Sequence, residues 1–155
     1  MGQHRRLLLA GLAAITLLLA GACQSAGDTT ASNDTTATDD GSTVTMWTRA
    51  PTATFTQTLI DEYNKTHENK VELTVIPADS YQQKVGSASG AKQLPDILAT
   101  DVVYAPNYAS KGLFQDLTKR VGTLPFKDTL APAHLKTATY DGKIYGVPHD
   151  IDLSA

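Results

Sequence analysis

Apolar and polar residues alternate in several short stretches beyond residue 42, which is the pattern of half-buried strands. Residues 71–75 (VELTV) alternate in this way and Pro77 follows, so we expect a strand that the proline ends. Residues 43–48 are rich in threonine and valine and include a tryptophan, which predicts a first strand. A third, short strand is predicted over 96–100.

Between the first two expected strands, apolar residues recur at the spacing of a helix. Phe55, Leu59 and Tyr63 are four residues apart and Ile60 widens the stripe, so one helical face should pack inward. Pro51 precedes this stripe, and a proline is pre-set for the first turn of a helix. We therefore expect a helix between the first and second strands.

Two further helices and a hairpin are expected downstream. One helix runs from Asp79, as its N-cap, to about Ala88. Another spans 103–111 and is closed by Gly112 as its C-cap. Residues 140–143 (YDGK) predict a hairpin, because Asp-Gly favours the tight turn between two antiparallel strands.

The order strand, helix, strand, helix, strand predicts an α/β fold with right-handed crossovers and a parallel sheet. With the first strand in the centre, the sheet order is 2-1-3 and the topological switch point lies between strands one and three. Ligands of open α/β sheets bind at that point, outside the carboxyl ends of the strands. The expected substrate-binding residues end or follow these two strands: Trp47, Thr48, Arg49, Thr100, Asp101 and Tyr104.

Several of these residues also have a simpler interpretation. Trp47 suits core packing as well as ligand contact, since tryptophan is mostly buried. Arg49 has a fork of donors for a polar ligand, but it could equally be a solvated surface arginine. Asp101 can accept hydrogen bonds from hydroxyl groups, although its position before the 103–111 helix slightly favours an N-cap role. The two roles of Asp101 are compatible.

The beginning of the chain has the order of an export signal. Arg5 and Arg6 precede an uncharged apolar run over 7–19, and small residues lead to Cys23, the only cysteine. The run is shorter than the roughly 20 residues that cross a bilayer. The segment resembles the signal of bacterial lipoproteins, which implies removal of 1–22 and attachment of lipid to Cys23. The alternative is an ordinary secretory signal beside an incidental cysteine.

The residues after Cys23 are small or polar. The stretch from Gln24 to Ser42 contains no large apolar side chain and cannot offset its ordering entropy, so we expect 23–42 to be a flexible tether. Loss of the two signal arginines leaves eleven basic and sixteen acidic residues, a net charge of −5. That charge argues against nucleic acid as a partner. No cysteine remains for a disulfide, so the body over 43–155 depends on a packed core.

Six landmarks follow one another in the body of the chain. They are the strand that ends in Trp47, the helix around 59–63, the strand 71–75, Ala88-Ser89-Gly90 with 94–97 (LPDI), 108–117 (YASKGLFQDL) and 141–148 (DGKIYGVP). In this order they resemble the N-terminal lobe of family 1 extracellular solute-binding proteins, the lipid-anchored sugar receptors of ABC importers. The resemblance extends from Thr43 to Leu153.

The resemblance implies a receptor anchored on the extracytoplasmic face of the membrane. It would bind a carbohydrate, deliver it to ABC permease subunits, and act as a monomer without a cofactor. It also implies that the segment after Pro148 lines the cleft, with Asp152 where some sugar receptors carry an acidic ligand-binding residue. In an extended segment Asp150 and Asp152 would point together and His149 would oppose them. Family members continue across a hinge into a second lobe, so we expect 43–155 to be a truncated N-terminal lobe.

Other functions find less support in the sequence. Residues 86–90 look like a nucleophile elbow, but the central residue is Ala88 rather than serine, so we expect no enzyme. A metal site from His149, Asp150 and Asp152 would need a bend, because these side chains lie on opposite faces. A lipid-anchored secreted enzyme or surface adhesion protein of α/β type is the alternative.

Overall fold

The computed structural model describes residues 38–150, and a three-stranded parallel sheet lies at its centre. The strands are β1 (Thr43–Arg49), β2 (Lys70–Ile76) and β3 (Ile97–Leu98), in the order β2-β1-β3. All seven residues of β1 pair with β2, whereas only two of them pair with β3. The predicted α/β class, the parallel direction and the order 2-1-3 are confirmed.

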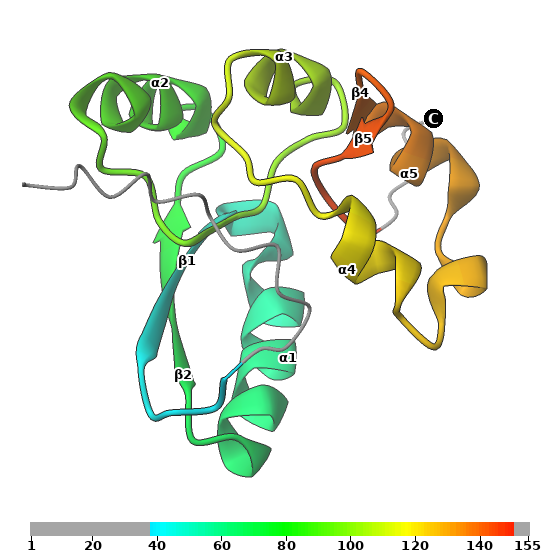
Figure 1. The fold of residues 1–155 in the computed structure, drawn as a ribbon. Helices are drawn as coiled ribbons and strands as arrows, with labels where there is room; N and C mark the ends of the chain where they lie inside the picture. Colours follow the sequence, from blue (N-terminus) through cyan, green and yellow to red (C-terminus); the bar gives the residue numbers. More distant parts are fainter. Residues whose placement is uncertain (1–37, 151–155) are drawn as a thin grey trace, which may run out of the picture. The chain divides into compact units, whose positions relative to one another are not determined.

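In chain order, the helical segments of residues 38–150 are η1 (Ala50–Thr52), α1 (Ala53–Thr66), α2 (Tyr81–Ala91), α3 (Ala105–Ser110), α4 (Thr118–Gly122), η2 (Lys127–Thr129) and α5 (Pro132–Thr137). A hairpin of β4 (Thr139–Tyr140) and β5 (Lys143–Ile144) follows α5. Helix α1 lies beside the sheet, whereas α4, α5 and the β4–β5 hairpin lie away to one side of it (Figure 1). Within residues 38–150, none of the helices is both long and apolar enough to cross a membrane.

Helix α1 packs along β1 and β2 with a face that differs from the predicted one (Figure 1). Ile60 is buried as expected, but its buried companion is Thr56, while Phe55 and Leu59 are 47% and 48% exposed. The prediction was wrong because it ranked positions by hydrophobicity alone. Thr56 can face the sheet because its hydroxyl group donates a hydrogen bond to the backbone carbonyl of Thr52.

The core on the other face of the sheet is built around α2. Tyr81 and Val85 are fully buried and form a cluster with Ile76 and Tyr108. The Tyr81 hydroxyl donates to the backbone carbonyl of Ala99, just beyond β3. Because burial raises the pKa of Tyr81, this hydroxyl keeps its proton and remains a donor.

Two predicted helix starts were wrong. Helix α2 begins at Tyr81 after Ser80 and has no side-chain cap, so Asp79 is not its N-cap. Helix α3 begins at Ala105, two residues later than predicted, and also lacks a side-chain cap. The end of α3 agrees with expectation, since Gly112 follows the final turn with a φ of +69°, a left-handed value that suits glycine.

The hairpin after α5 is confirmed and is tied to the preceding chain. Asp141 and Gly142 have φ values of +48° and +72°, the left-handed conformations that a two-residue turn between antiparallel strands requires. The Leu117 N–H donates to the Ile144 carbonyl at 2.7 Å, and the Ile144 N–H donates to Thr118 Oγ1 at 2.9 Å. These bonds fix the point from which residues 145–150 leave the hairpin.

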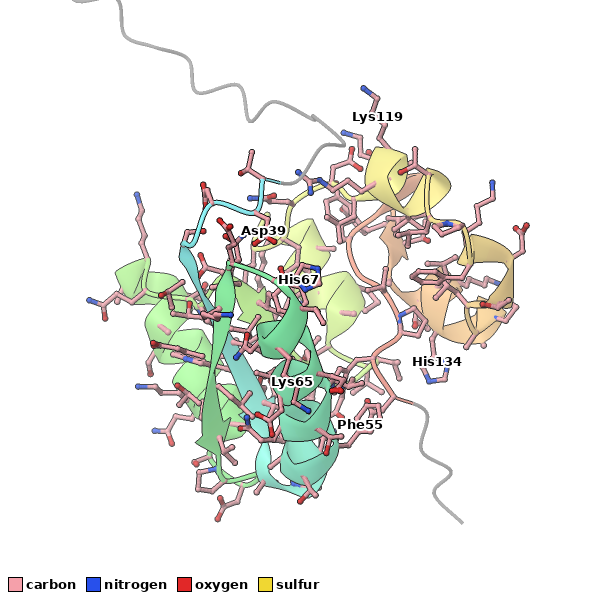
Figure 2. The ribbon with its side chains drawn as sticks, turned by 90° about the horizontal axis from the view of Figure 1, so that it is seen from below. Asp39, Phe55, Lys65, His67, Lys119 and His134 are labelled. Carbon is pink, nitrogen blue, oxygen red and sulfur yellow. The ribbon has the colours of Figure 1, made fainter. Side chains whose placement is uncertain are left out.

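Residues 38–42, which the sequence assigned to the end of the tether, contact the body at Asn69. Asn69 Oδ1 accepts hydrogen bonds from the backbone N–H groups of Asp40 and Gly41, and Asp39 accepts one from the Asn69 N–H. These bonds lie near the His67 end of α1 (Figure 2). The bond from Asn69 holds the pKa of Asp39 below its usual range. The expected signal, Cys23 and residues 24–37 lie outside the described residues.

Candidate functional site

The carboxyl ends of β1 and β3 meet at an ion pair. Arg49 is the last residue of β1, and its Nη2 lies 2.6 Å from Oδ1 of Asp101, three residues beyond β3. The two side chains are 27% and 34% exposed, so the pair is partly shielded from solvent. The sequence slightly favoured Asp101 as a helix N-cap. That expectation was wrong, because α3 begins only after Tyr104 and the Asp101 carboxylate is engaged with Arg49.

A cavity of about 910 Å³ opens beside this ion pair. It brings together four of the residues that the sequence put forward: Arg49, Thr100, Asp101 and Asp150. The Thr100 hydroxyl is buried and has no hydrogen-bond partner within the described part of the chain. A buried hydroxyl normally has a partner, so this one is an exception.

The rest of the cavity wall is mainly apolar and comes from four parts of the chain. It includes Leu98 at the sheet, Leu113 and Phe114 after α3, His134 of α5, and Tyr145 and Val147 after the hairpin. A concave apolar wall with a few convergent polar groups is the usual composition of a small-molecule site.

Three of the predicted site residues lie elsewhere. Thr48 has no exposed surface, because its side chain points to the α1 face of the sheet. Trp47 packs against the core cluster, and Lys84 Nζ lies 5.3 Å from the centre of its ring. Of the two interpretations given for Trp47, core packing is therefore the one that the structure shows. Tyr104 stacks on Tyr108 at 6.2 Å between ring centres and does not line the cavity.

Threonine hydroxyls join the end of β1 to the start of α1. The Thr52 hydroxyl lies 3.2 Å from the Arg49 carbonyl and 2.7 Å from the Thr48 hydroxyl. Thr56 donates to the Thr52 carbonyl at 2.8 Å. The network fixes the backbone of Arg49, and thereby the position from which its guanidinium enters the cavity.

Residues 145–150 return along the cavity towards α1. His149 contacts Thr56 Oγ1 through Nε2 at 3.2 Å, and its ring meets Phe55 edge to face at 5.5 Å between centroids. His149 Nδ1 lies 3.2 Å from Asp150 Oδ1, so the expected opposition of these two side chains was wrong. Asp152 lies outside the described residues.

Sequence reasoning did not identify His134 and Tyr145 as part of the cavity wall. His149 belongs to the segment after Pro148 that the resemblance implied would line the cleft, although it was not named as a substrate-binding residue. His134 and Tyr145 carried no such signal, because α5 and the hairpin reach the cavity only through tertiary packing. Among residues 38–150, no cluster of three or more histidine and acidic side chains could hold a metal ion.

A sequence profile of the family described as bacterial extracellular solute-binding protein matches residues 58–154. This match covers more than half of the chain. The chain belongs to this family. Its members are substrate-binding receptors found outside the cytoplasm, and the resemblance noted in the sequence is confirmed.

Three solved structures with the same fold are described with a sugar or with acarbose. An ABC transporter solute-binding protein from Thermotoga lettingae, bound with alpha-D-tagatose, is 23% identical with a TM-score of 0.64, over 69% of this chain and 28% of that one. The GacH receptor of Streptomyces glaucescens, known in complex with acarbose, is 26% identical with a TM-score of 0.61, over 69% and 28%. The lacto-N-biose-binding protein of Bifidobacterium longum is 25% identical with a TM-score of 0.62, over 74% and 30%. The chain thus spans less than a third of these proteins.

Proposed function

We propose that this chain is part of a lipid-anchored receptor that captures a sugar or oligosaccharide for import by an ABC transporter, and that it has no enzymatic activity. The observation that supports this function is the Arg49–Asp101 pair at the wall of the cavity. The solved structures named above supply the ligand class, because each is described in complex with a sugar or an acarbose-type molecule.

The chemistry of these groups suits a polyhydroxylated ligand. A carboxylate accepts hydrogen bonds from two hydroxyl groups, and a guanidinium has five N–H donors, of which one ion pair uses only part. The Asp150 carboxylate would add a second acceptor, and Phe114 and Tyr145 would offer apolar surface to a sugar ring.

Calorimetric titration of the protein encoded by the complete reading frame, against a panel of mono- and oligosaccharides, tests this function. We expect one sugar class to bind. Asp101→Asn should weaken that binding about tenfold or more, because it removes an ionised hydrogen-bond acceptor and breaks the ion pair with Arg49. Asp79→Asn is the matched control, since Asp79 is exposed and not part of the cavity wall.

Two results would contradict the proposal. One is an absence of sugar binding by the complete protein. The other is a reading frame that continues into a catalytic domain, which would favour the alternative of a lipid-anchored enzyme. Permease genes beside the frame would support import.

The proposed anchor has its own test. Cys23→Ala should abolish incorporation of a labelled fatty acid, because the thiol is the expected attachment point and two or more acyl chains are needed for stable anchoring. Metabolic labelling of cells that express the parent chain and the variant measures this. Label that persists in the variant would refute the assignment.

A further inference from the structure

Asn69 presents a buried amide side chain to the segment that precedes β1. It lies directly before β2 and is only 8% exposed, although asparagine is mostly found at the surface. Its Oδ1 accepts hydrogen bonds from three consecutive backbone N–H groups, those of Asp40 at 2.8 Å, Gly41 at 2.9 Å and Ser42 at 3.2 Å. A buried polar side chain costs free energy unless it is paired, and the segment 38–42 supplies these partners.

Two further hydrogen bonds complete the attachment. Asn69 Nδ2 donates to the Thr38 carbonyl at 2.8 Å, and the Asn69 N–H donates to Asp39 Oδ1 at 2.6 Å. Both ends of the side-chain amide are thus engaged, together with the backbone N–H of the same residue. Each residue from Thr38 to Ser42 therefore makes a hydrogen bond with Asn69.

The segment has the backbone conformation that this convergence requires. Gly41 has a φ of +79°, a left-handed value that residues with a Cβ adopt only at a cost. The Ser42 N–H also lies 3.1 Å from Asp40 Oδ1, so the Asp40 carboxylate closes the turn around Gly41. The Ser42 carbonyl accepts from the Lys70 N–H at 3.1 Å. The turn therefore leads directly into the pairing of β1 with β2.

The attachment lies at the opposite end of β1 from the cavity. The parallel strands β1 and β2 both begin beside Asn69, whereas Arg49 ends β1 at the cavity wall. The seven residues of β1, at about 3.3 Å each, place its two ends roughly 20 Å apart. A segment held at Asn69 is thus kept away from the candidate site.

We propose that Asn69 is an intramolecular binding site that fastens residues 38–42 to the body, so that the expected tether joins the body at residue 38 rather than at residue 43. Release of these five residues would add about 17 Å of extended chain to the reach of the tether. The consequence for an anchored receptor rests on the proposed function. With lipid on Cys23, Asn69 fixes the point at which the body is held and leaves the cavity at the far end of β1.

Amide exchange of the full chain in detergent micelles, followed residue by residue with nuclear magnetic resonance, tests the attachment. In the parent chain the N–H groups of Asp40 and Gly41 should exchange on the order of tenfold more slowly than in an unstructured peptide, because both are hydrogen-bonded. Asn69→Ala removes their acceptor and should return both to the unstructured rate. Protection of Leu73, which pairs with Met46 inside the sheet, shows whether the variant is folded.

A second variant opens the attachment from the side of the segment. Gly41→Ala introduces a Cβ where φ is +79°, so the turn is strained although the space around it is open. Exchange of the Asp40 and Ser42 N–H groups should become several-fold faster. Because this variant leaves Asn69 and the strands unchanged, it decides the question if Asn69→Ala does not fold.

Asn64→Ala is the matched control. Asn64 also joins its side chain to the backbone of β2, since its Oδ1 accepts from the Val71 N–H at 2.8 Å and its Nδ2 donates to the Val71 carbonyl at 3.0 Å. Its side-chain hydrogen bonds are with Val71 rather than with residues 38–42. The variant should therefore leave the exchange of Asp40 and Gly41 unchanged.

Three results would overturn the proposal. They are exchange of Asp40 and Gly41 at the unstructured rate in the parent chain, protection that survives in a folded Asn69→Ala, and a loss of protection in Asn64→Ala as large as in Asn69→Ala. The experiment contains no sugar and no fatty-acid label. Its failure would leave the proposed function intact, and failure of sugar binding or of lipid labelling would leave the attachment at Asn69 intact.

Discussion

Thr48 and Arg49 are neighbours in β1 with opposite surroundings, because successive side chains of a strand point to opposite faces of the sheet. Thr48 is fully buried among the hydroxyls of Thr52 and Thr56, whereas Arg49 reaches the cavity and pairs with Asp101. Replacement of Thr48 would therefore act on stability, and replacement of Arg49 would act on the site.

The exposed carboxylate of Asp96 connects β1 to the start of β3. Asp96 Oδ2 accepts from the Thr45 N–H at 2.8 Å and from the Thr45 hydroxyl at 2.7 Å. In return, the Asp96 N–H donates to Thr45 Oγ1 at 3.1 Å. The bonds from Thr45 hold the pKa of Asp96 below its usual range. This carboxylate thereby links β1 to the residue just before β3.

The depressed pKa makes a pH-dependent prediction. Because the pKa of Asp96 is lower in the folded state, its contribution to stability is complete above about pH 5 and is lost as the pH falls through the unfolded and then the folded value. Asp96→Asn should lower the free energy of unfolding on the order of 0.5 kcal/mol at neutral pH, since the group is exposed and screened. The variant should also flatten the decline between about pH 5 and 3.

Denaturant unfolding at several pH values measures this effect. Asp79→Asn, at an exposed position outside the sheet, serves as the control and should follow the parent chain. Parallel curves for the parent chain and Asp96→Asn across the acidic range would contradict the assignment.

At the scale of elements, the long strand β1 and the short strand β3 have different roles. β1 carries the pairing of the sheet, while β3 contributes only two paired residues and then turns away to place Thr100 and Asp101 beside Arg49. Helix α1 receives His149 on the side that bears Phe55, which projects from the helix and is labelled in Figure 2. The exposed Phe55 is thus partly covered by a segment that lies 94 residues away in the chain.

At the scale of the whole molecule, the chain spans 28–30% of the sugar-binding proteins to which it is similar. Ligand sites of this kind bury most of the ligand surface, which requires contacts from several directions. The described cavity is lined by residues between Arg49 and Asp150, so its polar groups all come from this one part of the protein.

We therefore predict that the 155-residue chain binds sugars weakly, with a Kd of about 1 mM or above. Calorimetric titration with the same sugar panel as for the complete protein measures this. Micromolar affinity in the short chain would contradict the prediction, because it would mean that residues 1–155 already enclose the ligand.

The sequence by itself determined the order of strands and helices, the parallel sheet, the Asp-Gly hairpin and the glycine after α3. These features follow from local periodicity, turn chemistry and the handedness of crossovers, all of which act over short distances along the chain. The same reasoning correctly placed Arg49 and Asp101 at the end of adjoining strands, since the carboxyl ends of parallel strands share one edge.

Only the tertiary structure decided which side chains face the cavity and which face of α1 is buried. Thr56 is buried in preference to Phe55 because a hydroxyl can satisfy its hydrogen bonds inside the fold, which no hydrophobicity pattern records. Asp101 binds Arg49 rather than α3, and His149 reaches Thr56 across 93 residues, because packing brings distant groups to hydrogen-bond distance. Such pairings depend on the geometry of the whole fold and leave no periodic trace in the chain.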